Sequence, residues 1–232
     1  MCIRDRRFTL GGDVLLDVSG TSTGVFEYDP SGNLVKDGLN RLEFSYNCLN
    51  LMQTVQTTVG ASKAQFTYGS DGRKLSEKAG TGGFEYLGSL IYAYRGGTLS
   101  LAQAVTDEGT IQSAGVNYFI RDHLGSVRAV VDHTGKIVER NDYYPFGGRH
   151  ENASLPLTGV NRYKFGGKET LEPVSLDMLD FGARFYDPRI ARWNTQDPLA
   201  EKYFSLSPYN YCAGNPVTVT DPDGRALLSL QN

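Results

Sequence analysis

The chain has 232 residues, and its 23 Lys and Arg against 26 Asp and Glu leave a net charge of −3. This balance, without a basic tail or stripe, argues against counterion-driven binding of nucleic acid. With 27 glycines, 14 tyrosines and only 3 methionines, the composition is typical of turn-rich β structure and unlike that of a helical bundle. No stretch approaches roughly 18 consecutive apolar residues, so the sequence predicts no membrane-spanning helix.

Cysteine and histidine give no sign of a disulfide-bonded or metal-bound fold. Cys2, Cys48 and Cys212 are far apart, odd in number and without C-x-x-C spacing. The 3 histidines lack the spacing of metal ligands on a helix. We therefore expect neither a disulfide framework nor a metal site, and no cofactor.

The first six residues, MCIRDR, are the translation of ATG TGT ATA AGA GAC AGR, which resembles the end of a transposon-type sequencing adapter. We interpret residues 1–6 as adapter-derived and exclude them from the fold reasoning. On this interpretation the natural protein continues upstream and the chain is a fragment. The absence of a signal peptide then carries no information about its compartment.

An aromatic pair with one residue between its members recurs at residues 26–28, 44–46, 66–68 and 84–86. Because side chains at i and i+2 share one face of a strand, each pair is expected to bury two rings and turn the middle residue outward. Turn residues follow three of the pairs: DPSGN, NCLN and SDGR. The apolar residue after each turn is predicted to begin the returning strand, namely Leu34, Leu51 or Leu75. One hairpin cannot bury its face alone, so these units are expected to stack into a sheet; a generic β meander without a true repeat is the alternative.

The strongest single hairpin signal lies at residues 126–140, where SVRAVV and KIVER flank the turn residues DHTG. Around it the sequence changes to short aromatic phrases punctuated by glycine, and residues 148–160 are predicted to form a loop. The sequence thus predicts an all-β chain with a repeat half and a terminal half.

The phrase YDPSGNL at residues 28–34 resembles the Y-D-x-x-G-x-L consensus of the Rhs, or YD-repeat, family, and the later units are degenerate copies. More specific phrases follow: YFIRDHLGSVR at 118–128, YYPFG at 143–147, RYKFGGKE at 162–169, FGARFYDP at 181–188, RW at 192–193, DPL at 197–199, NP at 215–216 and DPDG at 221–224. Together they are similar to the Rhs repeat-associated core, in the form typical of Bacteroidota, and the resemblance covers about residues 20–225.

This resemblance implies stacked β-hairpins that wind into a hollow shell, with a turn-rich core domain as the cap of one end. The physical reading agrees, because a solenoid of hairpins exposes an edge that its terminal segment must cover. By this resemblance we divide the chain into adapter-derived residues 1–6, degenerate YD-repeat hairpins at 7–115, the repeat-associated core at 116–225 and a C-terminal stub at 226–232.

The resemblance also implies partners and a location. In full-length relatives the shell encloses a C-terminal toxin or other effector, so the implied partners are upstream YD repeats and that effector. The implied role is a structural end-cap of the shell in a polymorphic toxin protein, secreted or at the cell surface.

Some relatives process themselves with an aspartyl-protease-like pair and cut the backbone just after a P-x-x-x-x-D-P-x-G-[Leu] phrase, which residues 216–224 match here. By motif position the resemblance assigns the two carboxylates to Asp197 and Asp221 and the supporting cation to Arg184. Two close carboxyl groups do not both ionise readily, so one stays protonated as the acid while the other activates water. Where self-cleaving members carry Leu, this chain has Arg225, which sets a charge against a pocket for an apolar side chain.

Each of these residues also has a structural interpretation. Asp-Pro occurs four times, at Asp29, Asp187, Asp197 and Asp221, and this dipeptide commonly opens a turn. Arg184 lies between aromatic residues and is equally consistent with a buried cation stacked on rings. An adhesion module that binds cell-surface glycans through exposed tyrosines is a further alternative. The sequence leaves three classes open: scaffold, self-cleaving aspartyl-type peptidase, and carbohydrate-binding or adhesion module.

Overall fold

The computed structural model describes residues 6–11, 14–20, 24–150, 161–171 and 178–229. Residues 1–5, 151–160 and 230–232, which fall in the predicted adapter-derived segment, loop and stub, lie outside the described residues. The chain is nearly all β, as the sequence predicts. The helices of the described ranges are short 3-10 turns: η2 (Phe165–Gly167), η4 (Ala200–Lys202) and η5 (Cys212–Gly214). Within these ranges no helix has the length and apolar character to span a membrane.

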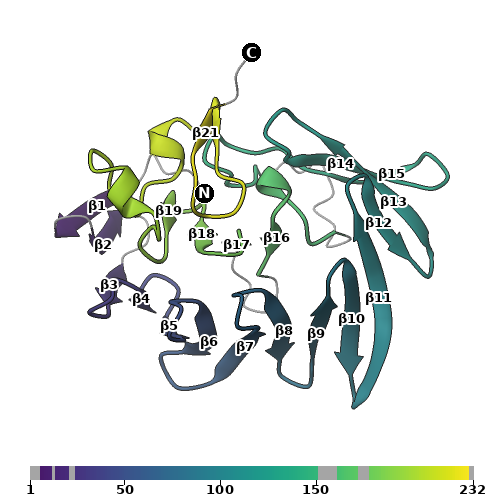
Figure 1. The fold of residues 1–232 in the computed structure, drawn as a ribbon, viewed down its shortest axis with the longest axis horizontal. Coiled ribbons are helices and arrows are strands. Elements are labelled where there is room, and N and C mark those ends of the chain that lie inside the picture. Colours follow the sequence, from purple (N-terminus) through teal and green to yellow (C-terminus); the bar gives the residue numbers. More distant parts are fainter. Residues whose placement is uncertain (1–5, 12–13, 21–23, 151–160, 172–177, 230–232) are drawn as a thin grey trace.

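Fifteen strands form one sheet in chain order. They are β1 (Arg6–Gly11), β2 (Val14–Gly20), β3 (Gly24–Tyr28), β4 (Leu34–Asp37), β5 (Leu42–Tyr46), β6 (Met52–Thr57), β7 (Ser62–Tyr68), β8 (Lys74–Ala79), β9 (Gly82–Leu87), β10 (Leu90–Arg95), β11 (Thr98–Thr106), β12 (Gly109–Gln112), β13 (Gly115–Arg121), β14 (Val127–Asp132) and β15 (Ile137–Arg140). Figure 1 shows the sheet as a curved band, purple to teal, around the green and yellow end of the chain. Because neighbours in sequence are neighbours in the sheet, the predicted stack of hairpins is confirmed.

The end of the chain packs on the concave face of this sheet. We call residues 161–171 and 178–229 the C-terminal segment. Its strands form a four-stranded and a two-stranded sheet: β16 (Glu169–Thr170), β17 (Leu179–Asp180), β18 (Phe185–Asp187) and β19 (Arg192–Trp193), then β20 (Val219–Thr220) and β21 (Leu228–Ser229). One core cluster joins Phe26, Phe44 and Phe66 of the large sheet to Phe185 and Ile190 of this segment. The predicted border between residues 115 and 116 lies within β13, which pairs with β12 in the large sheet.

An aspartate or asparagine side chain closes several hairpin turns. In the first, Asp29 Oδ1 accepts hydrogen bonds from the N–H groups of Ser31 (2.9 Å) and Asn33 (2.8 Å), while Gly32 has a φ of +77°. The side chains at positions 47, 122 and 132 accept the equivalent pair of bonds in their own turns. The side-chain oxygen satisfies N–H groups that the turn removes from the ladder, and glycine adopts the left-handed conformation without a Cβ clash. These turns confirm the predicted turn residues, including DHTG between β14 and β15.

The four aromatic pairs lie on β3, β5, β7 and β9. Phe26, Phe44 and Phe66 are at most 6% exposed, so the first ring of three pairs is core. The middle residue of each pair points to the opposite, convex face, where Glu27 pairs with Lys36 across strands β3 and β4. The tyrosines of these three pairs are half-buried against the same core cluster, so both rings of each pair lie on the core face as predicted but only the phenylalanine is fully buried. Phe84 of the fourth pair is half-buried.

Tyrosine hydroxyls join successive hairpins. Tyr46 donates a hydrogen bond to the carbonyl of Leu34, and Tyr68 donates one to the carbonyl of Met52, both at 2.7 Å. Leu34 and Met52 occupy equivalent places, because each is the register partner of the tyrosine of its own hairpin. Each bond therefore links one repeat to the one before it, which a generic meander does not require.

The first returning strand begins at Leu34, as predicted, whereas the other two begin at Met52 and Lys74 rather than at Leu51 and Leu75. Leu51 is buried just before β6, whereas Leu75 is 44% exposed on β8. The third prediction was wrong because the register partner of Tyr68 is Lys74, at the place that Leu34 and Met52 hold in the earlier hairpins, and the next residue along a strand points to the opposite face.

We predict that Tyr68→Phe lowers the free energy of unfolding by about 1–2 kcal/mol, because it leaves the buried carbonyl of Met52 without its donor. Urea denaturation measures this change. The matched control is Tyr94→Phe on the convex face, with an expected change within about 0.5 kcal/mol. Equal effects of the two substitutions would contradict the role of the Tyr68 hydroxyl.

Candidate functional site

The three predicted site residues lie at the ends of short strands in the C-terminal segment. Arg184 directly precedes β18, Asp197 follows β19 and Asp221 follows β20. Arg184 Nη2 is 2.9 Å from Asp197 Oδ2 and 3.4 Å from Asp221 Oδ2. The structure therefore brings all three together, with both carboxylates on one nitrogen atom. Their catalytic role stays a prediction.

All three guanidinium nitrogens of Arg184 have hydrogen-bond partners. Its Nε donates to the carbonyl of Gly224 at 2.6 Å, and its Nη1 donates to the carbonyl of Pro208 at 3.0 Å. The guanidinium also lies 4.1 Å from the centre of the Trp193 ring. Burial lowers the pKa of Arg184, while Asp197 and Asp221 oppose that shift. Arg184 therefore stacks on an aromatic ring and also pairs with the two carboxylates, so both interpretations of this residue from the sequence describe the same side chain.

Asp221 organises the turn that follows it. Its Oδ1 accepts hydrogen bonds from the N–H groups of Asp223 (3.3 Å), Gly224 (2.7 Å) and Arg225 (3.1 Å). Gly224 has a φ of +79°, and a Cβ there would lie 3.1 Å from the backbone nitrogen of Arg184. Burial raises the pKa of Asp221, although Arg184 and the backbone donors act in the opposite direction. This carboxyl group therefore keeps its proton to a higher pH than an exposed aspartate.

All four Asp-Pro aspartates form turns. The Oδ1 atoms of Asp29, Asp187, Asp197 and Asp221 each accept the N–H group two residues further on. What separates Asp197 and Asp221 is their second oxygen, which meets Arg184. Asp197 and Asp221 thus each use one oxygen to form a turn and the other to contact Arg184. Forming a turn therefore does not exclude a catalytic role for either residue.

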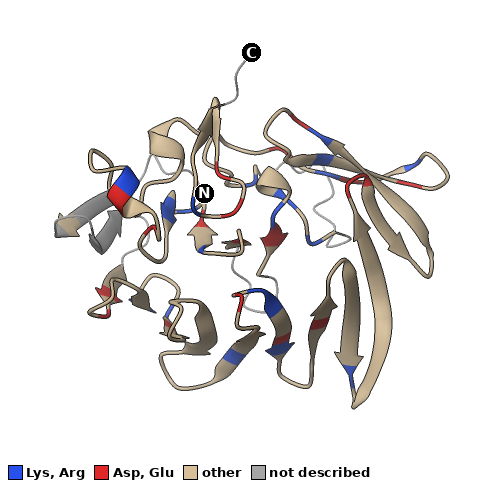
Figure 2. Ribbon diagram, viewed as in Figure 1, with Lys and Arg blue, Asp and Glu red and all other residues tan. Residues whose placement is uncertain are grey.

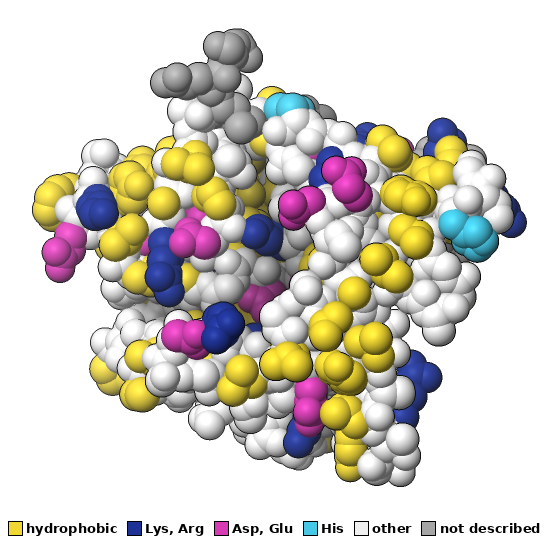
Figure 3. Space-filling model, turned by 45° about the vertical axis from the view of Figure 1, so that its right-hand side comes forward, with side chains coloured by type: hydrophobic (Ala, Val, Ile, Leu, Met, Phe, Trp, Pro, Cys, Tyr) yellow, Lys and Arg dark blue, Asp and Glu magenta, His cyan; other side chains and the backbone are white. Residues whose placement is uncertain are grey.

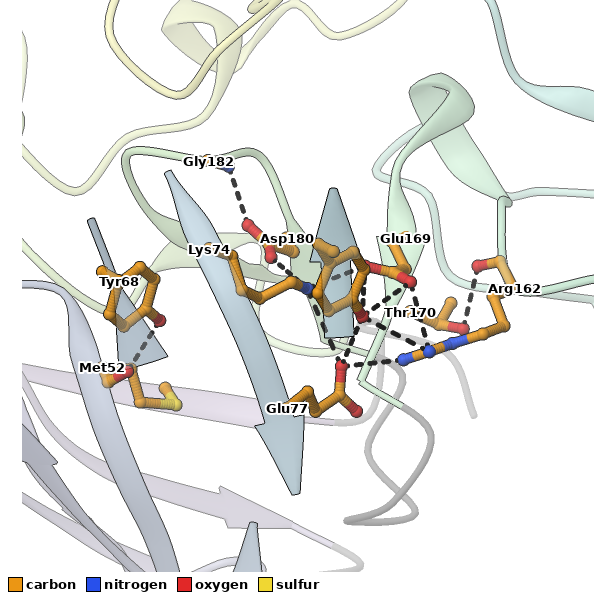
Figure 4. Close-up of polar contacts among 10 residues, drawn as sticks. Met52, Tyr68, Lys74, Glu77, Arg162, Glu169, Thr170, Asp180 and Gly182 are labelled. Atoms are coloured by element: carbon orange, nitrogen blue, oxygen red, sulfur yellow. Dashed lines mark hydrogen bonds and ion pairs between the residues drawn. The ribbon is translucent and has the colours of Figure 1, made fainter. Parts of the chain in front are cut away.

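A second group of charges, which the sequence reasoning missed, joins the sheet to the C-terminal segment. We call Lys74, Glu77, Arg162, Glu169 and Asp180 the charge network (Figure 4). Lys74 Nζ lies 2.7 Å from both Glu169 Oε2 and Asp180 Oδ2, and Arg162 Nη2 lies 2.8 Å from Glu77 Oε2. Figure 2 shows charged residues on β8 and β16, the strands that contribute Lys74 and Glu169.

The side chains of the charge network are almost fully buried. Exposure of its side chains ranges from 1% for Glu77 to 12% for Asp180. Burial lowers the pKa of Lys74, but Asp180 and Glu169 outweigh that effect and raise it well above its usual value. The hydroxyl of Tyr86 donates to Glu77 at 3.0 Å. Its position in the repeat is that of Tyr46 and Tyr68, so the fourth tyrosine bonds to a carboxylate instead of a backbone carbonyl.

One signal in the sequence could have revealed this network. Lys74 stands where the earlier repeats have Leu34 and Met52, both buried. A lysine at a core-facing repeat position requires carboxylate partners.

A cavity of about 450 Å³ is lined by residues of the charge network and of the turn after Asp221. Its walls include Lys74 and Asp180 of the charge network, and Asp223 and Arg225 of the turn after Asp221. Phe181 and Leu75 add apolar surface. Residue 225 therefore borders a mixed polar and apolar cavity rather than a purely apolar one.

Comparisons with known proteins agree with the geometry. The Teneurin YD-shell family model matches residues 108–212. Salivary gland surface protein 1 of Aedes aegypti is 38% identical over 110 residues, which are 47% of this chain and 3% of that protein. Toxin subunit YenC1 of Yersinia entomophaga is 30% identical over 113 residues, or 48% of this chain and 11% of the relative. Double-stranded DNA deaminase toxin A of Burkholderia cenocepacia is 27% identical over 87% of this chain and 17% of its own length.

Among solved structures, a crystal structure of TcdB2-TccC3-Cdc42 superposes with a TM-score of 0.69 at 19% identity. The match covers 95% of this chain and 13% of that one. At such identity the likeness shows the fold. The chain thus spans only a small part of the relatives that it matches.

Fold and sequence together define the class as an all-β shell of consecutive antiparallel hairpins with a packed terminal segment. The family-model match and the toxin-subunit relatives support the assignment of the chain as a fragment of an Rhs/YD-repeat protein.

We predict that Lys74→Met lowers the free energy of unfolding by about 3–5 kcal/mol, because it leaves buried carboxylates without their cation. Lys78→Met is the matched control, since Lys78 lies exposed on the same strand; its expected effect is within about 0.5 kcal/mol. Chemical denaturation of both variants provides the comparison. A Lys74 variant as stable as the Lys78 variant would show that the network contributes no stability.

Proposed function

We propose that this chain is the structural end-cap of an Rhs/YD-repeat shell in a toxin protein, and that the complete shell encloses a C-terminal effector. The observation that carries this proposal is the packing of the C-terminal segment on the concave face of the sheet. A curved sheet of hairpins has an open concave side, and a segment packed there covers it. Several relatives are named as toxins or toxin subunits, which supports the toxin context.

The proposed partners are further YD repeats that precede this part and an effector that follows it. The proposed location is outside the producing cell, by secretion or at its surface. Both belong to the whole protein, of which this chain represents one end of the shell.

We further propose that the end-cap cleaves its own backbone beside Arg225. In this mechanism Asp197 removes a proton from a water molecule, whose oxygen attacks the carbonyl carbon of the scissile peptide bond. Asp221 supplies a proton to the departing nitrogen, so that the products are a new carboxylic acid and a new amine. Burial of Asp221, which favours its protonated form, supports its role as the acid.

Arg184 supports this reaction by position. Its Nη2 faces both carboxylates, and its Nε holds the carbonyl of Gly224. The cavity beside residue 225 contains Asp71, Asp180 and Asp223 among its lining residues, so the site has carboxylates near the charge of Arg225. Arg225 therefore reduces cleavage without excluding it on grounds of charge.

We predict that a folded reporter fused after Asn232 is released at neutral pH by a cut beside Arg225. Asp197→Asn and Asp221→Asn should each abolish the cut, and Arg225→Leu should accelerate it. Intact-mass spectrometry measures the products. Asp29→Asn is the matched control, because Asp29 forms an Asp-Pro turn without contact to Arg184. A fusion that is folded and uncut in every variant leaves the chain a structural cap and refutes self-cleavage.

The proposed role of Asp221 as acid fixes the sign of the pH dependence. Its raised pKa means that the protonated, active form is lost as pH increases through that value. We predict that the rate of cleavage falls as the pH is raised. Because Asp-Pro bonds also break chemically in acid, the double variant Asp197→Asn with Asp221→Asn serves as the blank at each pH. A rate that increases with pH would assign the proton donor elsewhere.

One observation favours adhesion as a second candidate function. On the convex face, charged residues of β3–β9 give way to uncharged ones on β10–β13, where Leu101, Ile111, Tyr118 and Ile120 are each about half exposed. Figure 3 shows hydrophobic side chains gathered over this part of the surface. Tyrosine rings on such a face can stack on sugars. Binding to a glycan array that Tyr118→Ser abolishes would support this function, and no binding by the folded protein would remove it.

A further inference from the structure

The turn at residues 221–225 is held from outside at three consecutive carbonyl groups. The carbonyl of Pro222 accepts from Lys168 Nζ at 2.5 Å, and that of Asp223 accepts from the N–H group of Ala183 at 3.1 Å. The carbonyl of Gly224 accepts from Arg184 Nε. Since the next three N–H groups all donate to Asp221, the backbone of this turn is satisfied on both sides.

Lys168 differs from the other two donors by its origin. Ala183 and Arg184 come from one phrase of the chain, residues 181–188, whereas Lys168 follows η2 at the end of the RYKFGGKE phrase. That phrase has no role in the proposed chemistry. Through Lys168 it reaches across 54 positions of sequence to the turn.

The surroundings of Lys168 fix the direction of its side chain. Its ammonium lies 5.2 Å from the centre of the Phe181 ring and donates a hydrogen bond to the carbonyl of Pro222. The pKa of Lys168 is lowered, chiefly by burial and further by Arg121. The carboxylates of Asp180, Asp221 and Asp223 oppose this shift. A cation between a ring face and a backbone carbonyl has little freedom to leave that carbonyl.

We propose that Lys168 is a positioning residue that holds the turn at residues 221–225 in place for self-cleavage. It touches neither carboxylate in hydrogen-bond geometry, and it acts through the carbonyl of Pro222. With that carbonyl fixed, the adjoining peptide groups stay between Arg184 and the carboxylate of Asp221. This inference rests on the proposed self-cleavage and adds the residue that aligns its backbone.

The test combines cleavage with hydrogen exchange in the reporter fusion. In Lys168→Met we expect amide exchange at Gly224 and Arg225 to accelerate about tenfold, since one charge-assisted hydrogen bond is lost. Cleavage should slow by at least about tenfold with an unchanged pH profile, because the proton donor and acceptor are intact. Lys168→Arg should restore both, and Lys136→Met, at an exposed lysine in the turn before β15, should change neither.

Exchange in β14 serves as the internal reference for global unfolding. Equal exchange at Gly224 and Arg225 in wild type and Lys168→Met overturns the inference, whatever the cleavage rate. If the wild-type fusion is not cut, the proposed self-cleavage fails. In that case faster exchange in Lys168→Met still establishes that Lys168 holds the turn, and unchanged exchange refutes it.

Discussion

The contact between Lys74 and the carboxylates of Glu169 and Asp180 is the interaction on which the arrangement of this molecule depends. It joins β8 of the large sheet to β16 and β17 of the C-terminal segment, 95 and 106 positions away in sequence. Apolar clusters hold the two parts together without fixing their register, because hydrophobic contact has no direction. Buried charges are directional, since each one must meet its partner or bear a large desolvation penalty. We infer that the charge network sets where the C-terminal segment sits on the sheet.

The network also marks a change in the repeat. In the second and third hairpins a tyrosine hydroxyl binds a backbone carbonyl of the hairpin before it. Where the fourth hairpin meets the third, Lys74 of the third and Tyr86 of the fourth both contact carboxylates, and Lys74 Nζ lies 4.6 Å from the centre of the Tyr86 ring. Lys74 thus replaces the apolar residue of the earlier repeats at this position. As a result, the side chain contacts the C-terminal segment instead of the apolar core of the hairpins. From β17, which carries Asp180, the chain continues directly to Arg184 and the candidate site.

The local features of the fold could be predicted from the sequence, because they depend on residues close together along the chain. The Phe-x-Tyr alternation gave the buried face of β3, β5 and β7, and Asp29 and Gly32 identified the first turn. The prediction for Leu75 was wrong, because Lys74 and not the neighbouring leucine is the register partner of Tyr68 and takes the core-facing position of the repeat. The proximity of Arg184, Asp197 and Asp221 came from motif positions, and composition or spacing would not have supplied it.

Long-range charge pairing stayed hidden for a physical reason. In the sequence, Lys74 and Glu77 look like solvated residues of an exposed strand, and Glu169 looks like a surface charge beside Lys168. Only the folding of the C-terminal segment onto the sheet removes them from water. The hydrogen bond from Lys168 to the carbonyl of Pro222 could not be predicted either, because every residue has a backbone carbonyl and the sequence does not show which one a side chain will contact.

Zero-length cross-linking with a carbodiimide tests the central contact most directly, because it forms an amide only between an amine and a carboxyl group that touch. Lys74 and Asp180 line the cavity, which gives the reagent access. The account predicts that peptide mass spectrometry finds Lys74 joined to Glu169 or Asp180, alongside the surface pair of Lys36 and Glu27 at 2.5 Å as the positive control. Formation of the surface link in the folded protein without any link from Lys74 to the C-terminal segment would contradict it.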